Sequence, residues 1–183
     1  MLCNNPIGKG AGDWYVREAL RDWNQKLEQY LSGEIGLDAL LKAKARPRLL
    51  VKVKLANKDI EFEPATPQDT EKLWKALEKL RQIWGDPDIP IEPIPPYGNI
   101  GGGLRFPVQI IEKWYQFFNP RQLLTIVKLV KLIREAGKKV EEGKRREEWN
   151  EEDTFKDAEA ITTYLAITLT VYTGYNAMTS TEQ

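Results

Sequence analysis

The spacing of the apolar residues most constrains the fold of this 183-residue chain, because it is helical nearly everywhere and alternates in one stretch only. Apolar residues three and four apart predict helices at about residues 13–32, 67–84, 108–118, 120–142 and 151–175. Between about residues 48 and 63 the period becomes two, with Val51 and Val53 on one face and Lys52 and Lys54 on the other. We therefore expect a mainly α protein with one small antiparallel β-hairpin, an α+β fold.

Local signals support two of the predicted helix starts. Thr66 and Asn119 are side chains that favour the N-cap, and each is followed by a proline, which suits the first helical position. Gln122 follows Asn119 at the spacing of a capping box. The last predicted helix is so apolar that we expect it to be well buried. An isolated hairpin is marginal in water, so we also expect the apolar face of the hairpin to pack on helices.

The chain divides by composition into two halves joined by an irregular connector. Residues 13–84 form a helix–hairpin–helix half, and residues 108–183 form a helical half. Residues 85–107 between them are rich in proline and glycine, and a connection this long is functional or mobile in most compact domains. We expect the two halves to pack as one compact unit.

The absence of histidine and the single cysteine, Cys3, exclude several kinds of chemistry. A histidine general base, a Ser-His or Cys-His nucleophile pair and a histidine metal site are all ruled out. One thiolate cannot build a structural zinc site or an intrachain disulfide. The longest apolar run is too short for a membrane helix, and the N-terminus lacks the apolar core of a signal peptide. We therefore expect a cytoplasmic protein with no membrane partner.

The charge balance gives no overall attraction for nucleic acid, since 27 Lys and Arg residues match 27 Asp and Glu residues. The charge is nevertheless unevenly placed. Residues 42–54 contain six basic residues and no acidic one, whereas residues 147–153 form an acidic cluster. A local basic patch is therefore expected where a global field is not.

Residues 91–103, IEPIPPYGNIGGG, carry the Pro-Pro-Tyr and the glycine cluster of an adenine-methylating enzyme, but not its chemistry. Such an enzyme needs Asp or Asn before Pro-Pro-Tyr to accept hydrogen bonds from the target amine, and Ile94 stands there instead. No predicted strand precedes Gly101–Gly103, as a nucleotide-binding glycine loop requires. We expect an extended segment with Tyr97 as its anchor and no catalytic residue.

Another part of the chain resembles a known family. Residues 113–124 read KWYQFFNPRQLL, and residues 129–136 read LVKLIREA. These runs resemble the interior of the zinc-ribbon-containing adenine-specific DNA methylases of archaea and bacteria, which carry W-x-x-x-F-x-P-R-Q-L-L before a helix ending near I-R-E-A. Residues 163–166, TYLA, are similar to a later segment of that family, and the resemblance extends from about residue 14 to residue 176.

The resemblance implies a non-catalytic region of a DNA adenine-N6 methyltransferase. The family's S-adenosylmethionine loop lies N-terminal to this region and its Asp-Pro-Pro-Tyr motif lies C-terminal to it, and neither is present. Cys3, in the run CNNP, looks like the tail of a CxxC knuckle, so residues 1–12 are implied to be a zinc-ribbon remnant. S-adenosylmethionine and zinc are therefore expected only in the full-length family, and the chain alone is expected to be inactive. A split gene, a degenerate copy and an excised piece all remain open.

Basic and amide side chains on a strand and a helix are the candidates for nucleic-acid contact. They are Arg46, Arg48, Lys52, Lys54, Arg121, Gln122, Lys128 and Lys131. The strand residues suit phosphate contact, and a capped helix N-terminus suits a phosphate or a base edge. The alternative is that the basic strand and the basic helix stripe are solvated faces. Trp114, Tyr115, Phe117 and Phe118 fit a core better than a base-stacking platform.

Two functions of different classes follow from the sequence. The first is an accessory module that binds DNA weakly or docks on the catalytic portion of a split methylase. The second is a structural or protein-interaction module with no nucleic-acid role. A self-contained methyltransferase would bind S-adenosylmethionine, and we expect no such small-molecule ligand.

Overall fold

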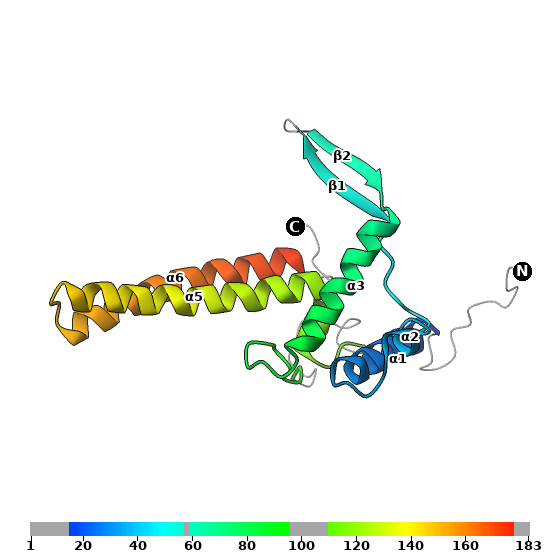
Figure 1. Ribbon diagram of the computed structural model, residues 1–183, viewed down its shortest axis with the longest axis horizontal. Helices are drawn as coiled ribbons and strands as arrows, with labels where there is room; N and C mark the ends of the chain where they lie inside the picture. Colours follow the sequence, from blue (N-terminus) through cyan, green and yellow to red (C-terminus); the bar gives the residue numbers. More distant parts are fainter. Residues whose placement is uncertain (1–14, 57–58, 96–109, 178–183) are drawn as a thin grey trace, which may run out of the picture. The chain divides into compact units, whose positions relative to one another are not determined.

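The computed structural model of the chain describes residues 15–56, 59–95 and 110–177 (Figure 1). It is mainly helical with one two-stranded antiparallel sheet, which confirms the fold class that the apolar spacing predicts. The chain forms two compact units. The first unit comprises Met1–Trp84 and Glu92–Gln116, and the second comprises Gly85–Ile91 and Phe117–Gln183.

Three helices form the core of the first unit: α1 (Tyr15–Leu31), the four-residue α2 (Leu37–Leu40) and α3 (Pro67–Gln82). The buried residues of α1 recur at helical spacing, as expected for an amphipathic helix with one side in a core. They are Ala19, Trp23, Leu27, Tyr30 and Leu31. Gly33, at φ +92°, ends α1 in the left-handed conformation that glycine adopts without strain.

The start of α3 is fixed by a capping box. The Thr66 hydroxyl accepts a hydrogen bond from the backbone N–H of Asp69 at 3.3 Å, and the Asp69 carboxylate accepts one from the backbone N–H of Thr66 at 3.0 Å. The carboxylate also accepts the Thr66 hydroxyl proton at 2.7 Å. Two N–H groups that the first helical turn leaves unpaired are thus satisfied.

The predicted hairpin is formed by β1 (Val51–Ala56) and β2 (Asp59–Pro64), paired antiparallel. Val53 lies opposite Phe62, and Lys52 lies opposite Glu63. Apolar and charged residues therefore occupy opposite faces, as the period of two predicts.

The helix predicted at residues 108–118 is wrong over the part that the structure describes. Only Trp114–Phe117 is helical, as the single 3-10 turn η3. The backbone before it pairs with a distant segment, because Pro93 and Lys113 form an antiparallel bridge and Ile94 N–H donates to the Glu112 carbonyl at 2.9 Å. These bonds take the backbone groups that a helix would have used.

Of the four aromatic residues around η3 that are predicted to be core, two are buried, Phe118 is half-buried and one is exposed. Tyr115 packs edge-on against Trp84 with ring centroids 5.1 Å apart, and burial raises the pKa of Tyr115 to about 12. Phe117 is buried as well, whereas Trp114 is exposed. The core interpretation therefore holds for Tyr115 and Phe117 and is wrong for Trp114.

The second unit is built on a helical hairpin of α5 (Pro120–Arg146) and α6 (Glu151–Asn176), which lie side by side (Figure 1). Asn119 Oδ1 accepts from the N–H groups of Arg121 and Gln122, and Gln122 Oε1 accepts from Asn119 N–H at 2.9 Å, which confirms the predicted capping box. Small residues meet where the helices touch: Gly137 on α5, and Thr154 and Ala158 on α6, are buried.

The segment Gly85–Ile91 belongs to this second unit and is tied to α5 by two ion pairs. Lys131 pairs with Asp86, and Arg134 pairs with Asp88. Ile89, which follows Asp88, is only 2% exposed. The first part of the predicted connector is thus irregular but anchored.

The expectation that the last helix is well buried is wrong. Of the described side chains of α6, only Thr154 and Ala158 are buried, and large apolar ones between residues 155 and 175 are exposed. The physical reason is that α5 is the helix with which α6 packs, and one neighbour covers one side of a cylinder.

Several predictions fall outside the described residues. They concern the zinc-ribbon remnant at residues 1–12 with Cys3, the anchor Tyr97 and the glycine cluster Gly101–Gly103.

Candidate interaction surfaces

The charged face of the hairpin is a network of ion pairs. Lys52 Nζ lies 2.9 Å from Asp69 Oδ2 and 3.7 Å from Glu63 Oε2, and Lys54 Nζ lies 2.5 Å from Glu63 Oε1. The hydrogen bond from Lys52 lowers the pKa of Asp69 and raises the pKa of Lys52, and the bond from Lys54 lowers the pKa of Glu63. Lys52 and Lys54 are thus brought together as predicted, but with acidic partners that weaken their attraction for phosphate.

Arg46 and Arg48 lie in the extended segment that leads into β1, and both are exposed. Within the described ranges neither guanidinium makes an ion pair or a hydrogen bond. Of the four candidates in the first unit, these two are therefore the ones with a charge that no described carboxylate offsets.

The other four candidates lie in the second unit, and only two of them have side chains that are available for contact with nucleic acid. Gln122 is engaged in the capping box, and Lys131 pairs with Asp86. Arg121 and Lys128 are exposed, and neither side chain has an ion-pair partner in the part of the chain that the structure describes. The eight candidates are thus divided equally between the two units.

The opposite face of the hairpin is apolar and exposed. Val51, Val53, Ile60 and Phe62 are between 50% and 73% exposed. The prediction that this face packs on helices is wrong for these residues. The hairpin instead contacts α3 through its charged face, where Lys52 meets Asp69, so the apolar face is turned away from α3.

The second exposed apolar surface is on α6, where residues 160–176 contain no charged side chain. Tyr164 is 75% exposed, Val171 54% and Tyr175 79%. The hydroxyls of Thr168 and Thr170 donate to the carbonyls of Tyr164 and Ala166, each at 3.0 Å, so these threonines use their polar atoms within the helix. The sequence itself indicates this surface. A helix without a polar face has to be covered by neighbours on more than one side.

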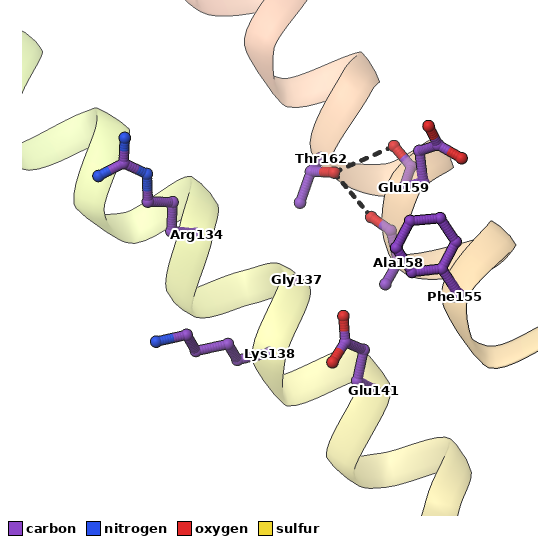
Figure 2. Close-up of a pocket in the computed structure, with 8 residues that line it drawn as sticks. All are labelled: Arg134, Gly137, Lys138, Glu141, Phe155, Ala158, Glu159 and Thr162. Atoms are coloured by element: carbon purple, nitrogen blue, oxygen red, sulfur yellow. Dashed lines mark hydrogen bonds between the residues drawn. The ribbon is translucent and has the colours of Figure 1, made fainter. Parts of the chain in front are cut away.

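A hollow of about 320 Å³ lies between α5 and α6 (Figure 2). It is lined by Arg134, Gly137, Lys138, Glu141, Phe155, Ala158, Glu159 and Thr162. Its only hydroxyl, that of Thr162, donates to the carbonyls of Ala158 and Glu159 at 2.8 and 3.0 Å, so it is not poised as a nucleophile (Figure 2).

The described residues carry neither a metal-binding group nor a membrane-spanning helix. Among the described residues no three Asp, Glu, Cys or His side chains are grouped so that they would hold a metal ion. No helix in the described ranges is long and apolar enough to cross a membrane. The chain matches no protein-family model, no curated protein and no solved structure. The features that bear on function are therefore the two exposed apolar surfaces and the exposed pair Arg46 and Arg48.

Proposed function

We propose that this chain is a non-catalytic accessory module that docks on another polypeptide through the apolar face of its β-hairpin. The supporting observation is the exposure of Val51, Val53, Ile60 and Phe62 on one face of a two-stranded sheet. A two-stranded hairpin is marginally stable in water without cover on its apolar face. The resemblance implies that the partner is the catalytic portion of an adenine-specific DNA methylase, carrying the S-adenosylmethionine loop and the Asp-Pro-Pro-Tyr motif.

The anchoring of the hairpin at its base favours this role. Ala65 N–H donates to the Leu50 carbonyl at 2.9 Å, and Lys52 pairs with Asp69 in the first turn of α3. A surface that is ordered before binding loses less conformational entropy when its partner arrives. Phe62, opposite Val53 in the centre of the face, has the size and position of an interface hot spot.

The proposal is tested by calorimetric titration of the chain with a polypeptide of the adenine-specific DNA methylase family that carries the S-adenosylmethionine loop and the Asp-Pro-Pro-Tyr motif. We expect Phe62→Ser to weaken binding by roughly thirtyfold, which corresponds to about 2 kcal/mol for a hot-spot side chain. Glu61→Gln, on the charged face of the same strand, is the matched control and leaves binding within about threefold. No binding by the natural chain, or equal losses for the two variants, overturns the proposal.

DNA binding is the second candidate, and the exposed pair Arg46 and Arg48 favours it. If they contact phosphates, the affinity for duplex DNA falls steeply between about 50 and 200 mM salt. Arg46→Glu with Arg48→Glu then abolishes binding, whereas Lys52→Glu with Lys54→Glu has a smaller effect, because those lysines already have acidic partners. Fluorescence anisotropy measures both. Binding that survives the arginine reversal shows that Arg46 and Arg48 are not the phosphate contacts, and a natural chain that does not bind duplex DNA overturns this second candidate function.

A further inference from the structure

Helix α6 carries a second apolar seam besides the one that faces α5. The side toward α5 includes Thr154, Ala158, Thr162 and Leu169, which are buried or half-buried. The second seam consists of Tyr164, Thr168, Val171 and Tyr175, all exposed. At 3.6 residues per turn the two seams lie roughly 110° apart around the helix. Two seams at such an angle are what a helix needs in order to contact two neighbours in a four-helix bundle.

The second seam has a spacing that reads the same in both directions. Its members are separated by four, three and four residues. A second copy of α6 running antiparallel therefore places its Tyr175 level with Tyr164 and its Val171 level with Thr168. Such self-complementarity is the requirement of a twofold interface.

The charges on α6 select this orientation. Glu151, Glu152 and Asp153 form an acidic first turn, and parallel copies would bring these turns side by side. In the antiparallel register the acidic turn of each copy lies beyond the end of the other copy's α6. The uncharged run of residues 160–176 also offers no cation to a phosphate, which argues against nucleic acid as the occupant.

The exposed area suits a second copy of the chain. Large apolar side chains offer on the order of 150–250 Å² each. The exposed parts of the seam and of its neighbours Ile161, Leu165 and Ile167 therefore amount to roughly 600 Å². This is close to the roughly 800 Å² per partner of a standard interface.

We infer that two copies of this chain associate through antiparallel α6 helices, so that their α5–α6 hairpins form a four-helix bundle. The association uses a surface on the second unit and does not depend on the docking proposed for the hairpin. The two proposals fail separately: Phe62→Ser leaves the dimer intact, and the loss of the dimer leaves the hairpin surface unchanged.

Sedimentation velocity of the full chain over a range of concentrations tests the inference. We expect a dimer, and we expect Val171→Glu to weaken it at least a hundredfold. Thr170→Glu is the matched control, since Thr170 is adjacent, β-branched and exposed but lies outside the seam, and the dimer persists. Far-UV circular dichroism checks that both variants remain helical. A natural chain that stays monomeric, or two variants that weaken the dimer equally, overturns the inference.

The register has its own test. Thr168→Lys alone is also expected to be monomeric, but a mixture of Thr168→Lys chains with Val171→Glu chains forms a heterodimer, because lysine and glutamate then lie level across the interface. Failure of the mixture to associate, with a dimeric natural chain, rejects the antiparallel register. If the natural chain is monomeric and Val171→Glu instead weakens binding of the catalytic polypeptide, the second copy is the wrong occupant.

Discussion

At the scale of single residues, Gly137 decides how closely α5 and α6 approach. A Cβ atom at this position would lie 2.7 Å from the Thr162 methyl group, well inside ordinary contact distance. The Thr162 side chain cannot easily rotate away, since its hydroxyl donates to the Ala158 carbonyl at 2.8 Å. Glycine inside a helix costs about 1 kcal/mol relative to alanine, and here that cost permits the close packing of two helices.

We predict that Gly137→Ala lowers the free energy of unfolding by about 1–3 kcal/mol, the usual range for overpacking. Gly143→Ala is the matched control on the same helix, because a Cβ at Gly143 meets nothing within 4 Å. It should raise stability by up to about 1 kcal/mol through helix propensity. Urea unfolding followed by circular dichroism measures both.

Thr162→Ser removes the obstructing methyl group and keeps the hydroxyl. Combined with Gly137→Ala it should restore most of the lost stability, because the new Cβ then has room. A double variant as unstable as Gly137→Ala would show that the loss has another cause. The sequence could not distinguish Gly137 from Gly143, since both are glycines in one helical pattern and the atom that matters belongs to another helix.

At the scale of elements, features set by neighbouring residues were predictable and those set by distant pairing were not. The N-cap at Thr66 and the capping box at Asn119 each need only a few consecutive residues, and both are present. The prediction of a helix at residues 108–118 is wrong because Pro93, which is distant in sequence, forms an antiparallel β-bridge with Lys113. The prediction that α6 is buried is wrong for a related reason. Apolar composition indicates that a helix needs a covering partner, but it does not indicate whether that partner belongs to the same chain.

Asp69 joins two elements, because its carboxylate both caps α3 and pairs with Lys52 of β1. Its pKa is lowered in the folded chain, so its contribution to stability is complete above the ordinary Asp value of about 3.9 and is lost as the pH falls below it toward the lowered value.

We therefore predict that Asp69→Asn removes part of the fall in stability between about pH 4 and pH 2, in addition to lowering stability at neutral pH. Glu71→Gln is the control: its pKa is lowered only by the exposed pair with Lys75, so its effect should be smaller. Urea midpoints across this pH range give the comparison. Identical pH profiles for the natural chain and Asp69→Asn would contradict the assigned role.

At the scale of the whole molecule, exposed apolar surfaces occur on a chain without net charge. Electrostatic repulsion between copies is therefore weak near neutral pH. The two surfaces lie on different compact units, the hairpin on the first and α6 on the second. The balanced composition predicts that no strong electrostatic field of one sign surrounds the molecule, and the uncharged run of α6 indicates an apolar surface. That this surface and the hairpin face are both exposed is known only from the structure.

We predict that self-association of the chain persists in about 1 M NaCl and is strengthened by sulfate, because burial of apolar surface is favoured by excluded salts while ion pairs are screened. Sedimentation velocity at rising salt makes the measurement. Dissociation by NaCl would show that charged groups, and not α6, hold the copies together.

The threonine hydroxyls of α6 allow the helix to move from water into a protein interface without losing hydrogen bonds. Thr168 and Thr170 donate to carbonyls one turn earlier, and Thr173 donates to Thr170 O at 2.8 Å. These donors keep the same acceptors whether the helix faces water or a dry interface. The helix can therefore pass from solvent to a protein partner and back without stranding a hydroxyl, so no exchange of those hydrogen bonds adds a barrier to assembly or to release.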